Sequence, residues 1–145
     1  MSAGGPRIVV GVDGSASSRA ALRWAVGQAR LTGGTVDAVI AWQLPMMPQH
    51  YSWAPIYVEE AEDFAEDARK RIDAAVSAEV EPTDSSLVRT HVMHGHPAQV
   101  LLDVADGADL LVVGSRGHGS FASALLGSVS QHCVHHAHGS VLVVR

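Results

Sequence analysis

Glycines and serines gather between residues 114 and 130, in a spacing that can bind phosphate. Two residues lie between Gly114 and Gly117, and nine (118–126) lie between Gly117 and Gly127. Because glycine has no Cβ, main-chain N–H groups at these positions can approach phosphate oxygens closely. Gly127 also precedes a predicted helix, whose first N–H groups have no partner within the helix and whose dipole attracts an anion. The candidate phosphate-binding residues are Gly114, Ser115, Arg116, Gly117, His118, Gly119, Gly127, Ser128, Val129 and Ser130.

The alternative for this segment is an ordinary turn from a strand to a helix. Such a turn would explain one glycine, but the segment holds four glycines and several serines after an apolar run, which favours phosphate binding. The pattern is neither a GxxxxGK[ST] phosphate loop nor an early GxGxxG dinucleotide turn. For Arg116 and His118, contact with a phosphate and plain exposure to solvent are equal alternatives.

Asp13 is a second candidate, because it follows the first apolar run in the sequence GVDGS (11–15). Open α/β sheets bind ligands at the C-terminal ends of their strands. A carboxylate there can accept hydrogen bonds from ribose hydroxyls or hold Mg²⁺ through water. The alternative is a turn-forming aspartate that caps the following helix together with Ser15. The residues alone leave both alternatives open.

Nine histidines are present, and four of them crowd the predicted last helix and its end. His132 and His136 are four residues apart, so they could share a helix face and bind a metal ion. No HExxH arrangement and no cysteine pair completes such a site. We therefore expect solvated histidines, which the dipole favours at a helix end, and no metal site.

The elements that must position these residues are apolar strands alternating with amphipathic helices. Continuous β-branched runs are typical of strands buried on both faces, and apolar residues at three- and four-residue steps predict helices. The order βαβαβαβαβ predicts a parallel sheet with helices on both faces, a three-layer α/β sandwich. We predict strands at 8–12, 36–42, 87–93, 110–113 and 141–144, and helices at 18–31, 58–80, 97–105 and 128–136.

Length and composition point to one domain that spans residues 1–145. The formal charge of −5 argues against general nucleic-acid binding. We find no apolar run that could span a membrane and no signal-peptide pattern. The single cysteine, Cys133, excludes an intrachain disulfide and favours a reducing compartment, so we expect a cytoplasmic protein.

These motifs resemble the ATP-binding branch of the universal stress protein family, whose signature is G-x2-G-x9-G-[ST]. The resemblance covers almost the whole chain, and no position of the signature departs from it. The residues that carry it are Gly114, Gly117, Gly127 and Ser128, the opening IVVGVDGS (8–15), the Gly95-His96-Pro97 turn, His136-Ala137 and the closing VLVVR (141–145).

The resemblance implies a five-stranded parallel sheet in the order 3-2-1-4-5, with Asp13 and the Gly114 segment facing one pocket. By family analogy, Asp13 contacts the ribose, and the main chain around Gly11 and Ala41 frames the adenine. The segments 114–119 and 127–130 would hold the triphosphate of ATP, with Mg²⁺. The resemblance also implies a homodimer formed through the last strand, Val141–Arg145.

Two classes of function remain open for such a chain. The first is a stress-response regulatory protein that acts through ATP occupancy and dimerisation. The second is an enzyme, either a slow ATPase or a nucleotide-transferring enzyme. A binder of AMP or cyclic AMP is a further alternative, which differs from the first class in its ligand. Efficient phosphoryl transfer needs a positioned base and cations near the reacting phosphate. Beside the glycine segment we find only Arg116 and His118 and no acidic pair, so we assign no catalytic residue and favour binding.

Overall fold

The computed structural model describes residues 4–44, 58–116 and 127–145. Within these ranges, strands and α-helices alternate along the chain, as the apolar patterns predict. The elements are β1 (Arg7–Gly11), α1 (Ala16–Thr32), β2 (Thr35–Trp42), α2 (Val58–Glu79), the 3-10 helix η2 (Pro82–Leu87), β3 (Val88–His94), α3 (Pro97–Ala105), β4 (Leu110–Gly114), α4 (Ser128–His136) and β5 (Val141–Val144).

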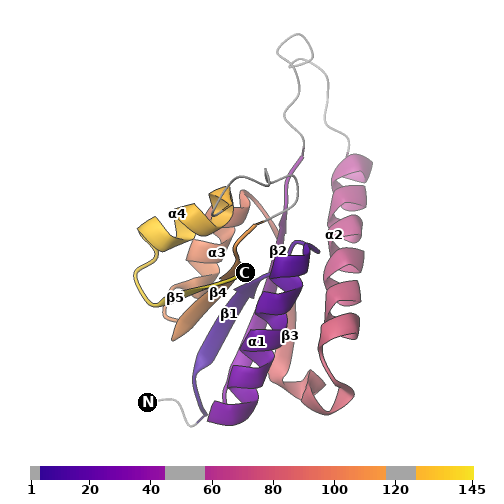
Figure 1. Ribbon diagram of the computed structural model, residues 1–145. Coiled ribbons are helices and arrows are strands. Elements are labelled where there is room, and N and C mark those ends of the chain that lie inside the picture. The colour runs from indigo at the N-terminus through magenta and orange to yellow at the C-terminus, as the bar shows by residue number, and fades with distance from the viewer. Residues whose placement is uncertain (1–3, 45–57, 117–126) are drawn as a thin grey trace.

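The strands form one parallel sheet in the order β3-β2-β1-β4-β5, so the predicted fold class is confirmed. Helices α1 and α2 cover one face, and α3 and α4 cover the other (Figure 1). The order of the strands reverses between β1 and β4, because the chain crosses from one half of the sheet to the other. That switch point brings the C-terminal ends of two central strands together, which is where open α/β sheets bind ligands.

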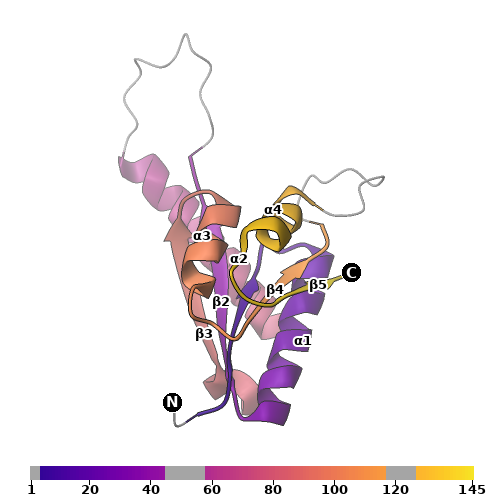
Figure 2. The same ribbon diagram turned by 90° about the vertical axis from the view of Figure 1, so that its left-hand side faces the viewer.

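Two apolar clusters hold the three layers together. Successive side chains of a strand point to opposite faces, so neighbouring residues of one strand enter different clusters. Val10 joins the cluster under α1 and α2, whereas Val9 joins the cluster under α3 and α4. A turned view shows α3 and α4 lying on the opposite side of the sheet from α1 (Figure 2). Strands buried on both faces explain why the apolar runs in the sequence do not alternate.

The ends of α1 follow the expected capping chemistry. The Ser15 side chain accepts a hydrogen bond from the N–H of Ser18, and Gly33 closes the helix with a φ of 72°. That φ is favourable only for residues such as glycine. The helix begins at Ala16, two residues before the predicted start at Ser18, because the cap is Ser15.

The region before β3 differs from the sequence prediction. A strand was expected from residue 87, but Leu87 ends η2, and β3 begins at Val88. Pro82 lies in the first turn of η2, where its missing N–H costs no hydrogen bond. Within the three described ranges, no helix combines the length and apolar character that a membrane crossing requires.

A buried carboxylate in β2 connects this strand to both of its neighbours, β1 and β3. Asp37 in β2 is 2% exposed, and its carboxylate accepts hydrogen bonds of 2.8 Å from Arg7 Nε and pairs at 2.9 Å with His91 Nε2. Arg89 Nε lies 3.3 Å from the same carboxylate. Burial raises the pKa of Asp37, but the hydrogen bonds from His91 and Arg7 and the positive charges of Arg89 and Arg7 outweigh it and hold the pKa below its usual value.

Candidate functional site

A cavity of about 430 Å³ opens at the C-terminal ends of β1, β2 and β4. Its volume falls in the range of small-molecule sites, and its walls come from both helix layers. The structure brings most of the candidate residues of the sequence to this one cavity. Those that line it are Gly11, Asp13, Ala41, Gly114, Arg116, Gly127, Ser128, Val129 and Ser130.

Four other candidates are placed differently. Ser115 is 6% exposed and lies beneath the cavity, where its N–H donates to the oxygen of Val144 at 2.7 Å. This bond continues the ladder between β4 and β5, so the Ser115 amide belongs to the sheet. Gly117, His118 and Gly119 lie outside the residues that the structure describes.

The main chain of β2 presents an open hydrogen-bonding edge at Ala41. The oxygen of Val39 accepts from the N–H of Val12 at 2.8 Å, so Val39 faces β1, whereas the oxygen of Trp42 accepts from Gly95 and faces β3. Because residues of a parallel strand alternate in direction, Ala41 turns to the same side as Val39. The pairing of β1 with β2 ends at Gly11 and Val39. The peptide groups of Ala41 therefore face the cavity beyond the end of β1.

The first turn of α4 points its N–H groups at the opposite end of the cavity. Gly127 is the N-cap, and the first donor within the helix is the N–H of Gln131, which bonds to the oxygen of Gly127 at 3.0 Å. The amides of the three residues between them precede that first helical bond, as at any helix start. Ser128, Val129 and Ser130 all line the cavity. Their N–H groups and the dipole of α4 could bind an anion, so this is the candidate anion-binding end of the cavity.

Other polar groups near this end already have partners inside the protein. The N–H of Gly127 donates to the oxygen of Ser115 at 2.5 Å, and the N–H of Arg116 donates to Ser17 Oγ at 3.3 Å. The hydroxyl of Ser130, which is 2% exposed, donates to the oxygen of Gly127 at 3.0 Å. Among the described residues, the anion-binding capacity of this end therefore resides mainly in the first α4 amides.

Asp13 forms the turn that its sequence position allows and also lines the cavity. Its Oδ1 accepts from the N–H of Ser15 at 2.8 Å, which forms the turn into α1. The N–H of Asp13 donates to Ser18 Oγ at 3.2 Å. The carboxylate is thereby fixed at the cavity wall between Ala41 and the start of α4.

Two glycines let helices approach the strand ends. A Cβ at Gly114 would lie 2.7 Å from Ser17 C and 2.7 Å from Ser18 N. These are backbone atoms of α1, so the clash could be relieved only by shifting the helix. A Cβ at Gly11 would lie 2.7 Å from a side-chain methyl of Leu101. Gly114 therefore allows the start of α1 to pack against the end of β4, a role that the phosphate hypothesis alone does not include.

One wall of the cavity escaped the sequence analysis. It is formed by α2 residues on one helical face, namely Phe64, Asp67, Ala68 and Arg71. Arg71 donates to Asp67 Oδ2 at 2.9 Å, and the two side chains are 47% and 66% exposed. In the sequence, the charged residues of α2 are typical of a solvated helix face. Only the placement of α2 over β2 and β3 reveals that part of this face borders the cavity.

The histidines of α4 form no metal centre with other described residues. Within the described ranges, no group of three or more His, Cys, Asp or Glu residues is arranged to hold a metal ion. The rings of His132 and His136 lie with their centroids 4.4 Å apart, as their four-residue spacing predicts. Cys133, between them, is 0% exposed, and burial raises its pKa to about 11.

Comparison with known proteins supplies the family context. The model of the universal stress protein family matches residues 6–145. A universal stress protein of Mycolicibacterium smegmatis is 37% identical over an alignment of 142 residues, and the match covers 94% of this chain and 47% of the relative. The chain thus spans about half the length of the curated relatives that it matches.

Solved structures of the family share the architecture. The universal stress protein UspA from Lactobacillus plantarum matches with a TM-score of 0.72 at 23% identity, over 99% of this chain and 100% of that one. A universal stress protein crystallised in complex with cAMP matches with a TM-score of 0.60 at 26% identity, over 99% and 98% of the two chains.

Proposed function

We propose that this chain, which belongs to the universal stress protein family, binds ATP with Mg²⁺ in the cavity above β1, β2 and β4. The observation that carries the proposal is the pairing of two unlike ends in one cavity. One end offers the peptide edge of Ala41, and the other offers the first amides of α4. A ligand with a flat hydrogen-bonding base and a chain of phosphates matches both ends.

The proposed orientation places each part of the nucleotide against a group that can bind it. Adenine carries an acceptor at N1 beside an amino donor, and the peptide N–H and C=O of Ala41 complement this pair. The main chain at Gly11 would border the same base. Asp13 would accept from the ribose hydroxyls. The phosphates would lie at the α4 amides and along the segment Gly114, Ser115, Arg116, Gly117, His118 and Gly119.

Mg²⁺ would be held chiefly by phosphate oxygens and water. Mg²⁺ keeps several waters and is usually bound through one or two carboxylates together with phosphates. Asp13 and Asp67 both line the cavity, and Asp13 is the one that follows β1, between β2 and β4 in the sheet. The metal would then neutralise phosphate charge in a chain whose formal charge is −5.

The proposed role is regulation of stress responses through nucleotide occupancy rather than catalysis. In the described part of the chain, the cations that line the cavity are Arg116 and Arg71, and Arg71 belongs to the α2 wall. A cavity of this kind can retain a nucleotide, but it offers little charge to stabilise a transferred phosphoryl group. Slow hydrolysis is the alternative, and His118 is the candidate general acid or base that the sequence offers for it.

AMP and cyclic AMP are alternative ligands for the same cavity. The relative solved in complex with cAMP favours this possibility at 26% identity. The three nucleotides share the base and ribose contacts and differ in the number of phosphates. The α4 amides should favour the longer phosphate chain, because three N–H groups can serve several oxygens.

We also propose a homodimer through β5 (Val141–Val144) and Arg145. β5 pairs with β4 on one side and lies at the end of the strand order, so its other edge is open. An open edge is a ready template for a second copy of the same strand. Size-exclusion chromatography with light scattering tests this, since a monomer at all concentrations would contradict the dimer.

Ser128→Pro is the sharpest test of ATP binding. Proline at the first position of a helix removes one N–H without breaking the helix, and Gly127 already has the extended conformation (φ −71°, ψ 165°) that a following proline requires. We expect ATP affinity, measured by calorimetry with Mg²⁺, to fall about tenfold, the loss of one hydrogen bond to a charged group. Ser128→Ala keeps the N–H and loses only the hydroxyl, so it is the matched comparison and should lose less affinity than Ser128→Pro.

Calorimetry with three ligands and an assay for ADP separate the alternatives. ATP binding that is tighter than AMP or cAMP binding, with little ADP released over minutes, is the expected result. If cAMP bound more tightly than ATP, cAMP would be the better candidate ligand. Hydrolysis of ATP at ~1 s⁻¹ would favour an enzyme. If no adenine nucleotide bound, the proposed function would fail.

A further inference from the structure

The α2 wall of the cavity is not explained by the nucleotide contacts proposed above. One face of α2 lines the cavity with an aromatic ring, a small apolar residue and two charged side chains. These residues are Phe64, Ala68, Asp67 and Arg71. Phe64 is 38% exposed, an unusual state for a large apolar side chain that borders a cavity. A flat ligand that covered the Phe64 ring would bury this apolar surface, which is favourable in free energy.

Arg71 forms an ion pair within α2 at this wall. It donates from Nη2 to Asp67 Oδ2 at 2.9 Å, one helical turn away. The guanidinium of Arg71 is half-exposed despite this ion pair, so a ligand in the cavity could still contact it. A guanidinium group is planar, and it stacks on the faces of aromatic rings.

The position of the wall in the sheet decides which part of a ligand it meets. α2 packs over β2 and β3, whereas α4 packs against β5 and α3. Neighbouring strands are about 4.8 Å apart, so β2 and β4, two steps apart, are separated by roughly 10 Å. Arg71 therefore belongs to the end where Ala41 lies, and not to the anion-binding end at α4.

From this placement, and resting on the proposed nucleotide site, we infer that Arg71 is a base-binding residue. Its guanidinium stacks on one face of the purine whose edge is bound by Ala41. Asp67 is a positioning residue, because it holds Arg71 and is itself more exposed. Phe64 extends the same wall with an apolar surface. The α2 wall thus selects for a nucleotide with a base over a phosphate compound without one.

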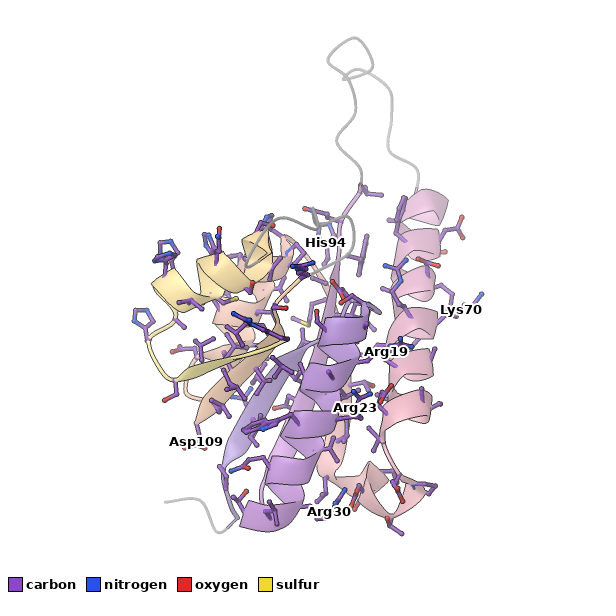
Figure 3. All side chains as sticks on the ribbon, in the orientation of Figure 1. Arg19, Arg23, Arg30, Lys70, His94 and Asp109 are labelled. Carbon is purple, nitrogen blue, oxygen red and sulfur yellow. The ribbon has the colours of Figure 1, made fainter. Side chains whose placement is uncertain are left out.

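Two substitutions at Arg71 distinguish stacking from charge. Arg71→Ala should weaken Mg·ATP binding about tenfold in calorimetry, as loss of a stacking partner for one base does. Arg71→Lys keeps the charge but loses the planar group, so it should lose most of the same affinity. Lys70→Ala is the matched control, because Lys70 is the adjacent residue and its side chain points away from α1 and the sheet (Figure 3). It should bind ATP as the wild type does.

Position within the cavity is tested by combining variants. Arg71→Ala and Ser128→Pro act at opposite ends, so their losses of binding free energy should add in the double variant. Thermal unfolding of each variant confirms the fold, which should persist because the Arg71 side chain is half-exposed.

Three outcomes would overturn the inference. Full ATP affinity in Arg71→Ala would show that the side chain does not touch the ligand. Full rescue by Arg71→Lys would assign Arg71 to a phosphate rather than to the base. A wild-type chain that binds no adenine nucleotide would overturn the proposed function and this inference together, whereas the first two outcomes would leave nucleotide binding intact.

Discussion

The hydroxyl of Ser17 donates a hydrogen bond of 2.6 Å to the main-chain oxygen of Arg116. The same hydroxyl accepts from the N–H of Arg116 at 3.3 Å. Ser17 lies in the first turn of α1, and Arg116 follows β4, so this pair ties the start of one helix to the segment that leaves the neighbouring strand. The two sides of the switch point are thereby fixed relative to each other.

Ser17→Ala should therefore loosen this connection. We expect a loss of about 1 kcal/mol in the free energy of unfolding, the usual net value of one intramolecular hydrogen bond. ATP affinity should fall by a few-fold, because Arg116 would lose its fixed position at the cavity. Chemical denaturation and calorimetry measure the two effects. Unchanged stability would mean that Ser17 contributes no net energy to the connection.

Gly114→Ala and Gly27→Ala form a matched pair. At Gly114 the new methyl group would overlap backbone atoms of Ser17 and Ser18, so we expect a destabilisation of about 2 kcal/mol. At Gly27, inside α1, the new methyl group would meet no atom within 4 Å apart from its chain neighbours and the nearby backbone of its own helix, and alanine is the better helix former. That variant should be more stable by about 0.5–1 kcal/mol. Equal melting temperatures for the two variants would contradict the packing argument.

Asp37→Asn should lower stability at neutral pH and flatten its dependence on acid. The folded-state pKa of Asp37 is lowered, since His91, Arg7 and Arg89 outweigh the burial that raises it. A depressed pKa contributes stability above the unfolded-state value, near 3.8, and that stability is lost as pH falls through the folded-state pKa. We expect a loss of about 2 kcal/mol at pH 7, the usual value of a hydrogen bond to a charged group, because the buried side chain no longer offers its charge to Arg7, Arg89 and His91.

The control for this variant is Asp67→Asn. Its ion pair with Arg71 is exposed, so the change should cost less than about 0.5 kcal/mol. Urea denaturation between pH 3 and pH 7 measures both variants. An equal pH dependence in wild type and Asp37→Asn would show that this carboxylate does not drive the acid response.

Cys133 should resist thiol reagents in the folded chain. It is fully buried, and its pKa of about 11 leaves roughly one thiolate in a thousand at pH 8. Reaction with Ellman's reagent should be negligible in the native state and complete in guanidinium chloride. Rapid native labelling would indicate that α4 opens frequently.

Much of the site was predictable because its signals are local. The predicted strand ends at residues 12 and 113 lie one residue from the observed ends at Gly11 and Gly114. The cap at Ser15 and the helix start at Ser128 follow from residue type and short-range spacing. Strand order came from the family resemblance, since periodicity alone says only that the sheet is parallel. The structure then confirmed that order.

The roles of Gly114, Ser130 and Ala41 illustrate where local signals end. Gly114 makes room for α1, and the Ser130 hydroxyl bonds within the protein, contacts that depend on segments far apart in sequence. The direction of the Ala41 peptide groups depends on which strand Val39 and Trp42 pair with. The residue pattern of β2 alone does not predict that Val39 bonds to Val12 or that Trp42 bonds to Gly95.

By itself, the sequence determined the alternating elements, their approximate ends and the family, because apolar periodicity, capping residues and a glycine signature act within short stretches of chain. Tertiary structure alone decided that Asp37 meets Arg7, Arg89 and His91. It also decided that Arg71, on a helix distant in sequence from the glycine segment, lines the same cavity as Ser128. The reason is physical: a side chain's function here depends on which helix covers which strand, and that is settled when the layers pack together.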